Sequence, residues 1–170
     1  MLIIMAGLPA SGKSMLARAL ADRLAGAVLD KDAIRAALFQ AGDVEYSAAQ
    51  DDLIMDLMLQ AARFLLQKDP ARIVFLDGRT FSHAYQRQRA IDFAETLPTP
   101  WSIIECVCSE ASARERLRAS GDHPAANRTF ALWQNVRATF EPIPPPKLLI
   151  DTDQPLDDCL SKALQAIASK

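Results

Sequence analysis

One eight-residue segment near the amino terminus, Gly7-Leu-Pro-Ala-Ser-Gly-Lys-Ser14, constrains the fold of this chain more than any other feature. It follows an apolar run at residues 2–5 that has the length of a buried strand, and it opens an amphipathic stretch at 13–24. Its two glycines allow a tight loop, so that successive amide N–H groups and the N-terminus of the following helix converge on a phosphate group. The segment therefore predicts a strand, a loop and a helix that together bind the phosphates of a nucleotide.

The polar residues at the end of this loop have separate expected roles. We expect Lys13 to contact the β- and γ-phosphates of ATP, while the hydroxyl of Ser14 provides one ligand to a bound Mg²⁺. The residues expected to contact the nucleotide here are Gly7, Pro9, Ala10, Ser11, Gly12, Lys13, Ser14 and Met15. The loop indicates nucleotide binding but does not by itself indicate transfer of a phosphate.

The rest of the chain alternates short apolar runs with amphipathic helical stretches. The apolar runs lie at 2–5, 27–29, 73–76, 103–107 and 148–150, and the expected helices span 13–24, 31–39, 48–68, 82–96, 110–119, 127–140 and 155–168. The helix at 48–68 is predicted from the helical spacing of Leu53, Leu57, Ala61, Phe64 and Leu65, behind a Ser47-Ala-Ala-Gln50 start that resembles a capping box. This order predicts a three-layer α/β fold, in which helices cover both faces of a five-stranded parallel sheet and every strand is buried on both faces. The length of 170 residues fits a single domain, which we expect to span 1–170.

Composition restricts the partners and the compartment. The net charge is -2 at pH 7, whereas proteins that bind long nucleic acids usually carry a cationic surface, so a nucleic-acid partner is disfavoured without being excluded. We expect the three cysteines, Cys106, Cys108 and Cys159, to be reduced core residues. The amino-terminal segment lacks a basic region, and its apolar run is too short for a signal peptide or a membrane span. These features predict a cytoplasmic protein with no membrane partner, and they leave the oligomeric state open.

A carboxylate and an arginine follow the second apolar run. Asp32 comes just after this run, and Arg35 lies three residues further on the same helical face. The carboxyl ends of parallel strands line the ligand crevice of open α/β sheets, where a carboxylate can accept a proton from a hydroxyl and an arginine can hold a polar or anionic group. The alternative is a helix cap with a surface ion pair.

A second carboxylate, Asp77, follows the third apolar run and is expected at the same edge of the sheet. There it would hold a metal-bound water or orient the acceptor, and the alternative is an ordinary turn aspartate. Arg79 and Thr80 come directly after it, and they either contact the acceptor or belong only to the loop.

Arginines gather further along the chain, in a possible lid at about 109–140. Arg114 and Arg118 lie four residues apart on one helical face, and Arg128 follows a glycine- and proline-containing loop. Such side chains could fold over the phosphates and neutralise charge during phosphoryl transfer. A solvated helix with salt bridges to the neighbouring glutamates is the alternative.

With these segments the chain resembles the small bacterial P-loop kinases related to polynucleotide kinase, chloramphenicol phosphotransferase, zeta toxin and adenylylsulfate kinase. The matching pieces are the loop at 7–14, Asp32-Ala-Ile-Arg35, Asp77, Ala113-Arg-Glu-Arg-Leu-Arg118, and the segment from Phe140 to Thr152. The resemblance implies that Asp32 is the general base, Arg35 an acceptor clamp and Asp77 a supporting carboxylate. It also implies that Arg114 or Arg118 belongs to the lid, and that Asp151 and Thr152 lie near the adenine.

The expected reaction is transfer of the γ-phosphate of ATP to a hydroxyl of a small molecule. Two alternatives are kept: a kinase of polynucleotide 5'-hydroxyls, and a nucleotide-binding regulatory module that hydrolyses ATP slowly. Gly78-Arg79 departs from the Asp-Thr-Asn type of sequence expected in polynucleotide kinases. The sequence does not indicate which small molecule accepts the phosphate.

Overall fold

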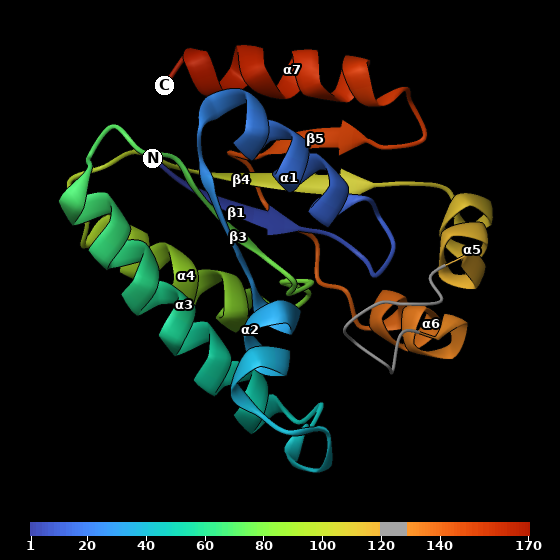
Figure 1. Cartoon of the computed structure of the whole chain (residues 1–170). Coiled ribbons are helices and arrows are strands. Elements are labelled where there is room, and N and C mark those ends of the chain that lie inside the picture. Colours follow the sequence, from blue (N-terminus) through green and yellow to red (C-terminus); the bar gives the residue numbers. More distant parts are fainter. Residues whose placement is uncertain (120–128) are drawn as a thin grey trace.

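The computed structural model describes residues 1–119 and 129–170, and it is built on a five-stranded sheet (Figure 1). The strands are β1 (Leu2–Ala6), β2 (Ala27–Asp30), β3 (Val74–Asp77), β4 (Trp101–Val107) and β5 (Leu148–Asp151). All pairings are parallel, and the strand order is β2-β3-β1-β4-β5. The predicted α/β fold with a five-stranded parallel sheet is confirmed, and each observed strand begins and ends within two residues of its predicted bounds.

Seven α-helices and one short 3-10 helix are found in the described part of the chain. The helices are α1 (Lys13–Leu24), α2 (Lys31–Leu38), α3 (Ala48–Lys68), α4 (Ala84–Glu95), α5 (Glu110–Ala119), α6 (Phe130–Ala138) and α7 (Leu156–Ala168), with the 3-10 helix η1 at Ala41–Asp43. The predicted ranges of α1, α3 and α5 are confirmed to the residue. The predicted start of α6, at residue 127, lies outside the described residues.

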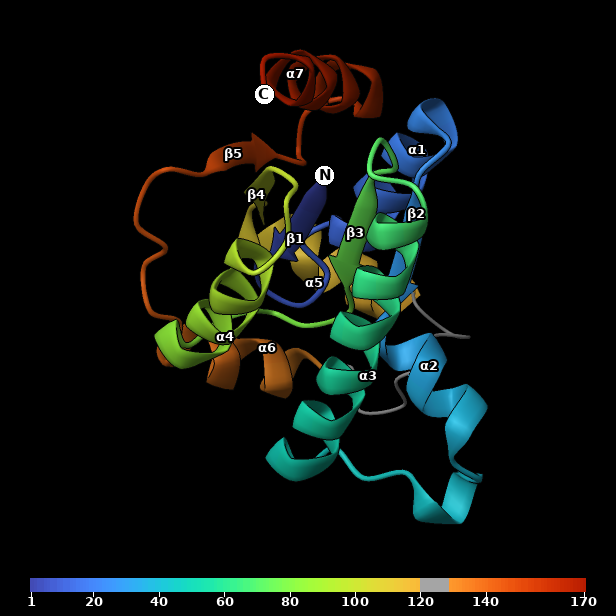
Figure 2. The same ribbon diagram turned by 90° about the vertical axis from the view of Figure 1, so that its left-hand side faces the viewer.

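Helices cover the two faces of the sheet in pairs (Figures 1 and 2). Strand β1 is fully buried, and its side chains alternate: Leu2 and Ile4 pack in the cluster that contains residues of α3 and α4, whereas Ile3 packs in the cluster that contains residues of α1 and α7. The prediction that every strand is buried on both faces was wrong for β2 and β5. These strands form the edges of the sheet, so each lacks one neighbour, and Leu149 of β5 is 46% exposed.

Helix α3 has the predicted length but a different rotation about its axis. The apolar spacing used to predict it runs through Leu53, Leu57 and Phe64, and all three are exposed. The buried face consists instead of Ile54, Met55, Met58, Leu59, Ala62 and Leu66. Because apolar residues surround most of this helix, their spacing identifies the helix but does not determine which face meets the sheet.

The start of α3 is capped as the sequence suggests, though by one hydrogen bond only. The Oγ of Ser47 accepts a hydrogen bond from the backbone N–H of Gln50 at 3.2 Å. The Gln50 side chain does not complete a reciprocal capping box, because its Oε1 accepts from the backbone N–H of Glu45 at 2.8 Å.

All three thiols are free, and Cys106 and Cys159 are buried whereas Cys108 is half-buried. Burial raises the pKa of Cys106 to about 12, which keeps this thiol protonated and unreactive at neutral pH. No helix within 1–119 and 129–170 has both the length and the apolar character needed to cross a bilayer.

The observed rotation of α3 predicts that two neighbouring truncations lower the stability by different amounts. Met58→Ala removes a fully buried side chain and should lower the free energy of unfolding by about 2–4 kcal/mol, whereas Leu57→Ala, at a position that is 38% exposed, should cost less than about 1 kcal/mol. Urea unfolding of both variants tests this. Equal losses would contradict the observed rotation.

Candidate active site

The loop between β1 and α1 is held in a conformation that only glycine tolerates at two positions. Gly7 has a φ of 135°, and a Cβ atom placed there would lie 2.2 Å from the carbonyl oxygen of Cys106 in β4. Gly12 has a φ of 80°, and a Cβ there would meet the side chain of Thr152 at 3.1 Å. The loop therefore lies directly against the ends of β4 and β5, as the predicted phosphate-binding loop requires.

Lys13 lies near the end of this loop and is the first residue of α1. Its side chain is buried, and its Nζ donates to the carbonyl oxygens of Gly7 at 2.9 Å and Leu8 at 2.8 Å. No side chain of the described residues caps α1, so the N–H groups of its first turn are left for an anion. This combination fits the phosphates of a nucleotide.

Thr152 and Arg116 support the loop from behind. The Thr152 hydroxyl lies 3.0 Å from the carbonyl oxygen of Ser11, and Arg116 of α5 donates to the carbonyl oxygen of Ala10 at 3.3 Å and to Thr152 Oγ1 at 2.9 Å. The nearby Asp151 is exposed, and its Oδ1 accepts from the backbone N–H of Asp153. Sequence reasoning missed Arg116, because three arginines alternate along α5 and their spacing alone does not show which one faces the loop.

The other predicted lid arginines lie further from the loop or outside the described residues. The guanidinium of Arg114 stacks 3.7 Å over the ring of Phe130 and pairs with Glu110 at 3.4 Å. Arg118 is exposed and makes no ion pair or hydrogen bond within the described chain. Arg128 lies outside the described residues, so the lid roles of these arginines stay predictions.

The carboxyl end of β2 leads directly into a cluster of charges. Asp30, and not Asp32, caps α2: its Oδ1 accepts from the backbone N–H groups of Asp32 at 3.0 Å and Ala33 at 3.2 Å. Asp32 instead pairs with Arg35 at 2.9 Å, and Arg35 is only 2% exposed. The alternative for Asp32, a helix cap with a surface ion pair, is therefore wrong, because another residue makes the cap and the ion pair is buried.

Two further members of this charge cluster were not predicted. Asp51 of α3 pairs through Oδ1 with Arg35 and with Lys31, the latter at 2.7 Å, and Lys31 Nζ also lies 3.8 Å from Asp32. The cluster thus joins the first turn of α2 to the first turn of α3. A charged residue in the first turn of a helix is common, so nothing in the sequence around Asp51 distinguishes it from a surface residue.

Asp77, at the end of β3, is paired in register with Asp30 and is fully buried. Burial raises the pKa of its carboxyl group, and the Ser14 hydroxyl and the Lys13 ammonium oppose this shift. Neither carboxylate oxygen makes a hydrogen bond of good geometry within the described residues. Two buried oxygens without partners, next to a hydroxyl, are the kind of donor set that Mg²⁺ prefers, so Ser14 and Asp77 fit the predicted magnesium site.

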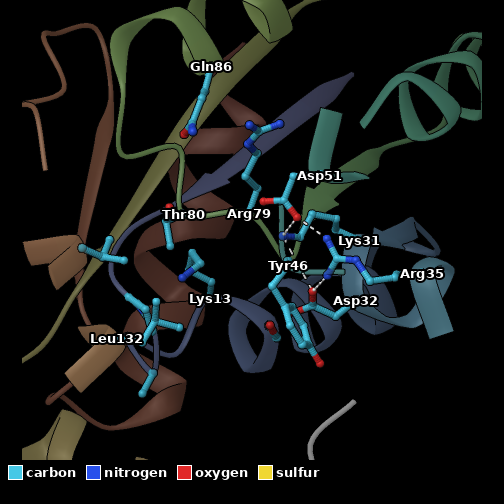
Figure 3. Close-up of a pocket in the computed structure, with 15 residues that line it drawn as sticks. Lys13, Lys31, Asp32, Arg35, Tyr46, Asp51, Arg79, Thr80, Gln86 and Leu132 are labelled. Carbon is cyan, nitrogen blue, oxygen red and sulfur yellow. Dashed lines mark hydrogen bonds and ion pairs between the residues drawn. The ribbon is translucent and has the colours of Figure 1, made fainter. Parts of the chain in front are cut away.

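These residues meet in one cavity of about 210 Å³ (Figure 3). Lys13, Ser14, Pro9 and Ala10 of the loop line one side, and Lys31, Asp32, Arg35 and Asp51 line the other. Arg79, Thr80 and Gln86 complete the wall after β3, with Tyr46, Leu132 and Val136. A second cavity of about 270 Å³ also borders the loop, and is lined by Gly12, Met15, Arg18 and Arg116 among others. The structure thus places the predicted residues Lys13, Ser14, Asp32 and Arg35 around one space.

A parallel five-stranded sheet whose first strand leads through this loop into α1 defines the fold of P-loop NTPases of the kinase type. The family model described as "AAA domain" matches residues 2–143, and the chain belongs to this family. No curated protein sequence matches the chain.

Several solved kinases share the fold across nearly the whole chain. A putative kinase from Chloroflexus aurantiacus is 24% identical, with 96% of each chain covered and a TM-score of 0.74. The APS kinase CysC of Mycobacterium tuberculosis, solved with AMPPNP and APS, is 17% identical, with coverage of 98% of this chain and 96% of that one and a TM-score of 0.75. A gluconokinase from Sinorhizobium meliloti is 20% identical, with coverage of 98% and 91% and a TM-score of 0.67. At these identities the likeness establishes the fold.

The contacts of the α5 arginines predict which of them supports the nucleotide. Arg116→Ala removes the hydrogen bonds to Ala10 and Thr152 and should weaken binding of Mg²⁺-ADP about 10-fold. Arg114→Ala, in which only the contacts to Glu110 and Phe130 are lost, should change it less than about 2-fold. Titration calorimetry measures both affinities. A larger loss in the Arg114 variant would contradict the assignment.

The burial of Asp77 predicts that removing its charge stabilises the protein in the absence of ligand. Because the pKa is raised, the folded state binds the proton more tightly than the unfolded state, so stability is lost as the pH rises from the ordinary pKa of an aspartate through the raised pKa. Asp77→Asn should therefore unfold at higher urea concentration at pH 8, by an amount on the order of 1 kcal/mol. The gain should shrink as the pH falls toward the ordinary pKa of an aspartate. A gain independent of pH would show that the charge is not its cause.

Proposed function

We propose that this protein is a kinase that transfers the γ-phosphate of ATP to a hydroxyl group of a small molecule. The observation that carries the proposal is the single cavity that reaches from Lys13 and Ser14 in the phosphate-binding loop to Asp32 at the start of α2. A phosphate held by the loop and a hydroxyl next to Asp32 would face one another across this space. Positioning of the two reactants and neutralisation of charge provide most of the catalysis in phosphoryl transfer.

In the proposed reaction Asp32 accepts the proton of the acceptor hydroxyl. Its Oδ1 is engaged by Arg35, which leaves Oδ2 for the proton. The hydroxyl oxygen then forms a bond to the γ-phosphorus, the bond from that phosphorus to the bridging oxygen breaks, and ADP leaves with the electron pair. Lys13 stabilises the charge on the phosphates.

The magnesium ion proposed at Ser14 and Asp77 would neutralise negative charge on the β- and γ-phosphates when bound. Asp77 contributes two oxygens that are buried and without partners in the described chain, and Ser14 contributes a hydroxyl beside them. We also propose that α5 and α6, within residues 109–140, form the lid of a single kinase domain at 1–170. Both helices lie beyond the carboxyl ends of the strands, where a lid would cover the phosphates (Figure 1).

The size and charge of the site favour a small acceptor. The cavity of about 210 Å³ is smaller than the roughly 300–1,000 Å³ typical of drug-sized ligands. The net charge of -2 disfavours a polynucleotide acceptor, because proteins that bind long nucleic acids usually carry a cationic surface. We accordingly propose ATP and a soluble metabolite as substrates, in the reducing environment that the three free thiols suit.

Two substitutions separate nucleotide binding from transfer. Lys13→Ala and Asp32→Asn should both reduce transfer from labelled ATP by at least about 1,000-fold, because one removes the phosphate contact and the other the proton acceptor. Only Lys13→Ala should weaken binding of Mg²⁺-ATP strongly. Transfer is measured across a panel of hydroxylated metabolites, antibiotics and oligonucleotides.

Other results of this experiment favour the alternatives. Salt-sensitive labelling of oligonucleotides would identify a polynucleotide 5'-hydroxyl kinase instead. Slow hydrolysis of ATP that no acceptor accelerates, and that Asp32→Asn leaves unchanged, would identify a nucleotide-binding regulatory module.

A further inference from the structure

The charge cluster at the start of α2 leaves two carboxylate oxygens without partners. Asp32 and Asp51 each use only Oδ1 for their ion pairs with Lys31 and Arg35. The Oδ2 atom of each makes no hydrogen bond or ion pair within residues 1–119 and 129–170, although both residues line the cavity. A carboxylate oxygen accepts hydrogen bonds, so these two atoms can accept two donors from a ligand in place of water.

Lys31 and Arg35 hold these two carboxylates in fixed positions. Arg35 is 2% exposed and contacts both aspartates, and the residue Lys31 is 8% exposed. A ligand hydroxyl is the natural donor to each Oδ2, because it can turn its O–H toward the carboxylate. Two neighbouring carboxylates therefore suit an acceptor with at least two hydroxyl groups, of which the one at Asp32 receives the phosphate.

Arg79 presents an incompletely paired guanidinium in the wall of the same cavity. The residue is 5% exposed, its Nη1 donates to Asp52 at 2.8 Å, and its Nε has no hydrogen-bond partner in the described chain. The Nη2 group makes no hydrogen bond or ion pair within residues 1–119 and 129–170, so it can donate to an oxygen of a carboxylate or phosphate.

The partner of Arg79 is itself shared. Asp52 also lies 3.5 Å from Arg89, which pairs with Asp56 as well and does not line the cavity. Two arginines and two aspartates form this second group, so its charges balance. Among the described residues that line the cavity beyond the phosphate-binding loop, Lys31, Arg35 and Arg79 are cationic, and Asp32 and Asp51 are anionic. Asp52 is not part of this lining, so Arg79 presents the cationic member of its pair to a ligand.

The backbone fixes Arg79 with respect to the charge cluster. Gly78 has a φ of 86°, and a Cβ there would lie 2.8 Å from the backbone nitrogen of Lys31, so the segment after β3 packs directly on the start of α2. Figure 3 shows Arg79 between Gln86 and Asp51, with Asp32 further along the same cavity. A ligand that reaches from Asp32 past Asp51 therefore brings its far end to Arg79.

We propose that the acceptor is a small polyhydroxylated molecule with a terminal oxyanion, a carboxylate or a phosphate, which binds Arg79 while two of its hydroxyls bind Asp32 and Asp51. This inference names the substrate class of the proposed kinase and rests on that proposed function. Arg79 is then the residue that selects anionic over neutral acceptors.

Matched sets of acceptors test the proposal. The three-carbon set is glycerol, glycerate and glycerol 3-phosphate, and the six-carbon set is sorbitol, gluconate and sorbitol 1-phosphate. In each set the members differ at one terminal carbon. The wild-type protein should phosphorylate an anionic member with a kcat/KM at least about 10-fold above that of its neutral counterpart. The comparison of glycerate or gluconate with the phosphate esters then shows which oxyanion is accepted.

Two variants separate recognition of the anion from support of the fold. Arg79→Gln should lower kcat/KM for the anionic acceptor about 10- to 100-fold and leave the value for the neutral acceptor within about 2-fold. Arg89→Gln is the matched control, because it also removes a guanidinium from Asp52 but from outside the cavity, and it should preserve the preference. Arg79→Lys, which keeps the charge without the planar guanidinium, should lose an intermediate amount.

A binding measurement distinguishes failure of this inference from failure of the proposed kinase. With Mg²⁺-ADP present, thermal unfolding is recorded with each acceptor. A rise in Tm with an anionic member that is absent in Arg79→Gln supports the anion site, even if no transfer occurs and the kinase proposal fails. Transfer to neutral members with no preference for the anion, or equal losses in Arg79→Gln and Arg89→Gln, would overturn the inference and leave the kinase standing. No transfer and no rise in Tm with any anionic member would overturn both.

Discussion

The close approach of the loop at residues 7–14 to strand β4 is the contact on which the rest of the site depends. Any side chain at Gly7 would overlap the carbonyl oxygen of Cys106, because a Cβ there would lie only 2.2 Å away. The loop consequently lies flat across the carboxyl ends of the central strands, and Thr152 and Arg116 hold it from behind. This fixed path sets where Lys13 and Ser14 stand with respect to the ends of β2 and β3.

A second constraint is the buried group of charges that faces the loop across the cavity. Burying two cations with two carboxylates costs desolvation free energy, and apolar residues of similar volume are often at least as stabilising in such positions. This cost is consistent with the proposed role of Lys31, Asp32, Arg35 and Asp51 as a binding surface. Burial of Asp77 also costs desolvation free energy. Burial raises the pKa of its carboxyl group, and no hydrogen bond of good geometry within the described chain offsets this cost.

Much of the fold could be predicted from local patterns, and the exceptions have identifiable causes. Strands and helices were predicted closely because apolar runs, glycines and prolines act over a few residues. The burial of β2 and β5 was overestimated because an apolar run does not show whether a strand lies at the edge of a sheet. The predicted rotation of α3 was wrong because apolar residues extend around the helix. In the structure Leu53 and Leu57 face solvent, while Met58 faces the core.

The sequence by itself determined the phosphate-binding loop, the order of the strands and helices along the chain, and the position of Asp32 and Asp77 after their strands. These features depend on residues that are neighbours in the chain, where spacing and backbone conformation are sufficient. Only the tertiary structure decided that Asp51 joins Arg35, that Arg116 rather than Arg114 contacts the loop, and that Arg79 lines the same cavity as Asp32. The physical reason is that these contacts join segments far apart in the sequence, and the packing of α2, α3 and α5 around the sheet brings their side chains together.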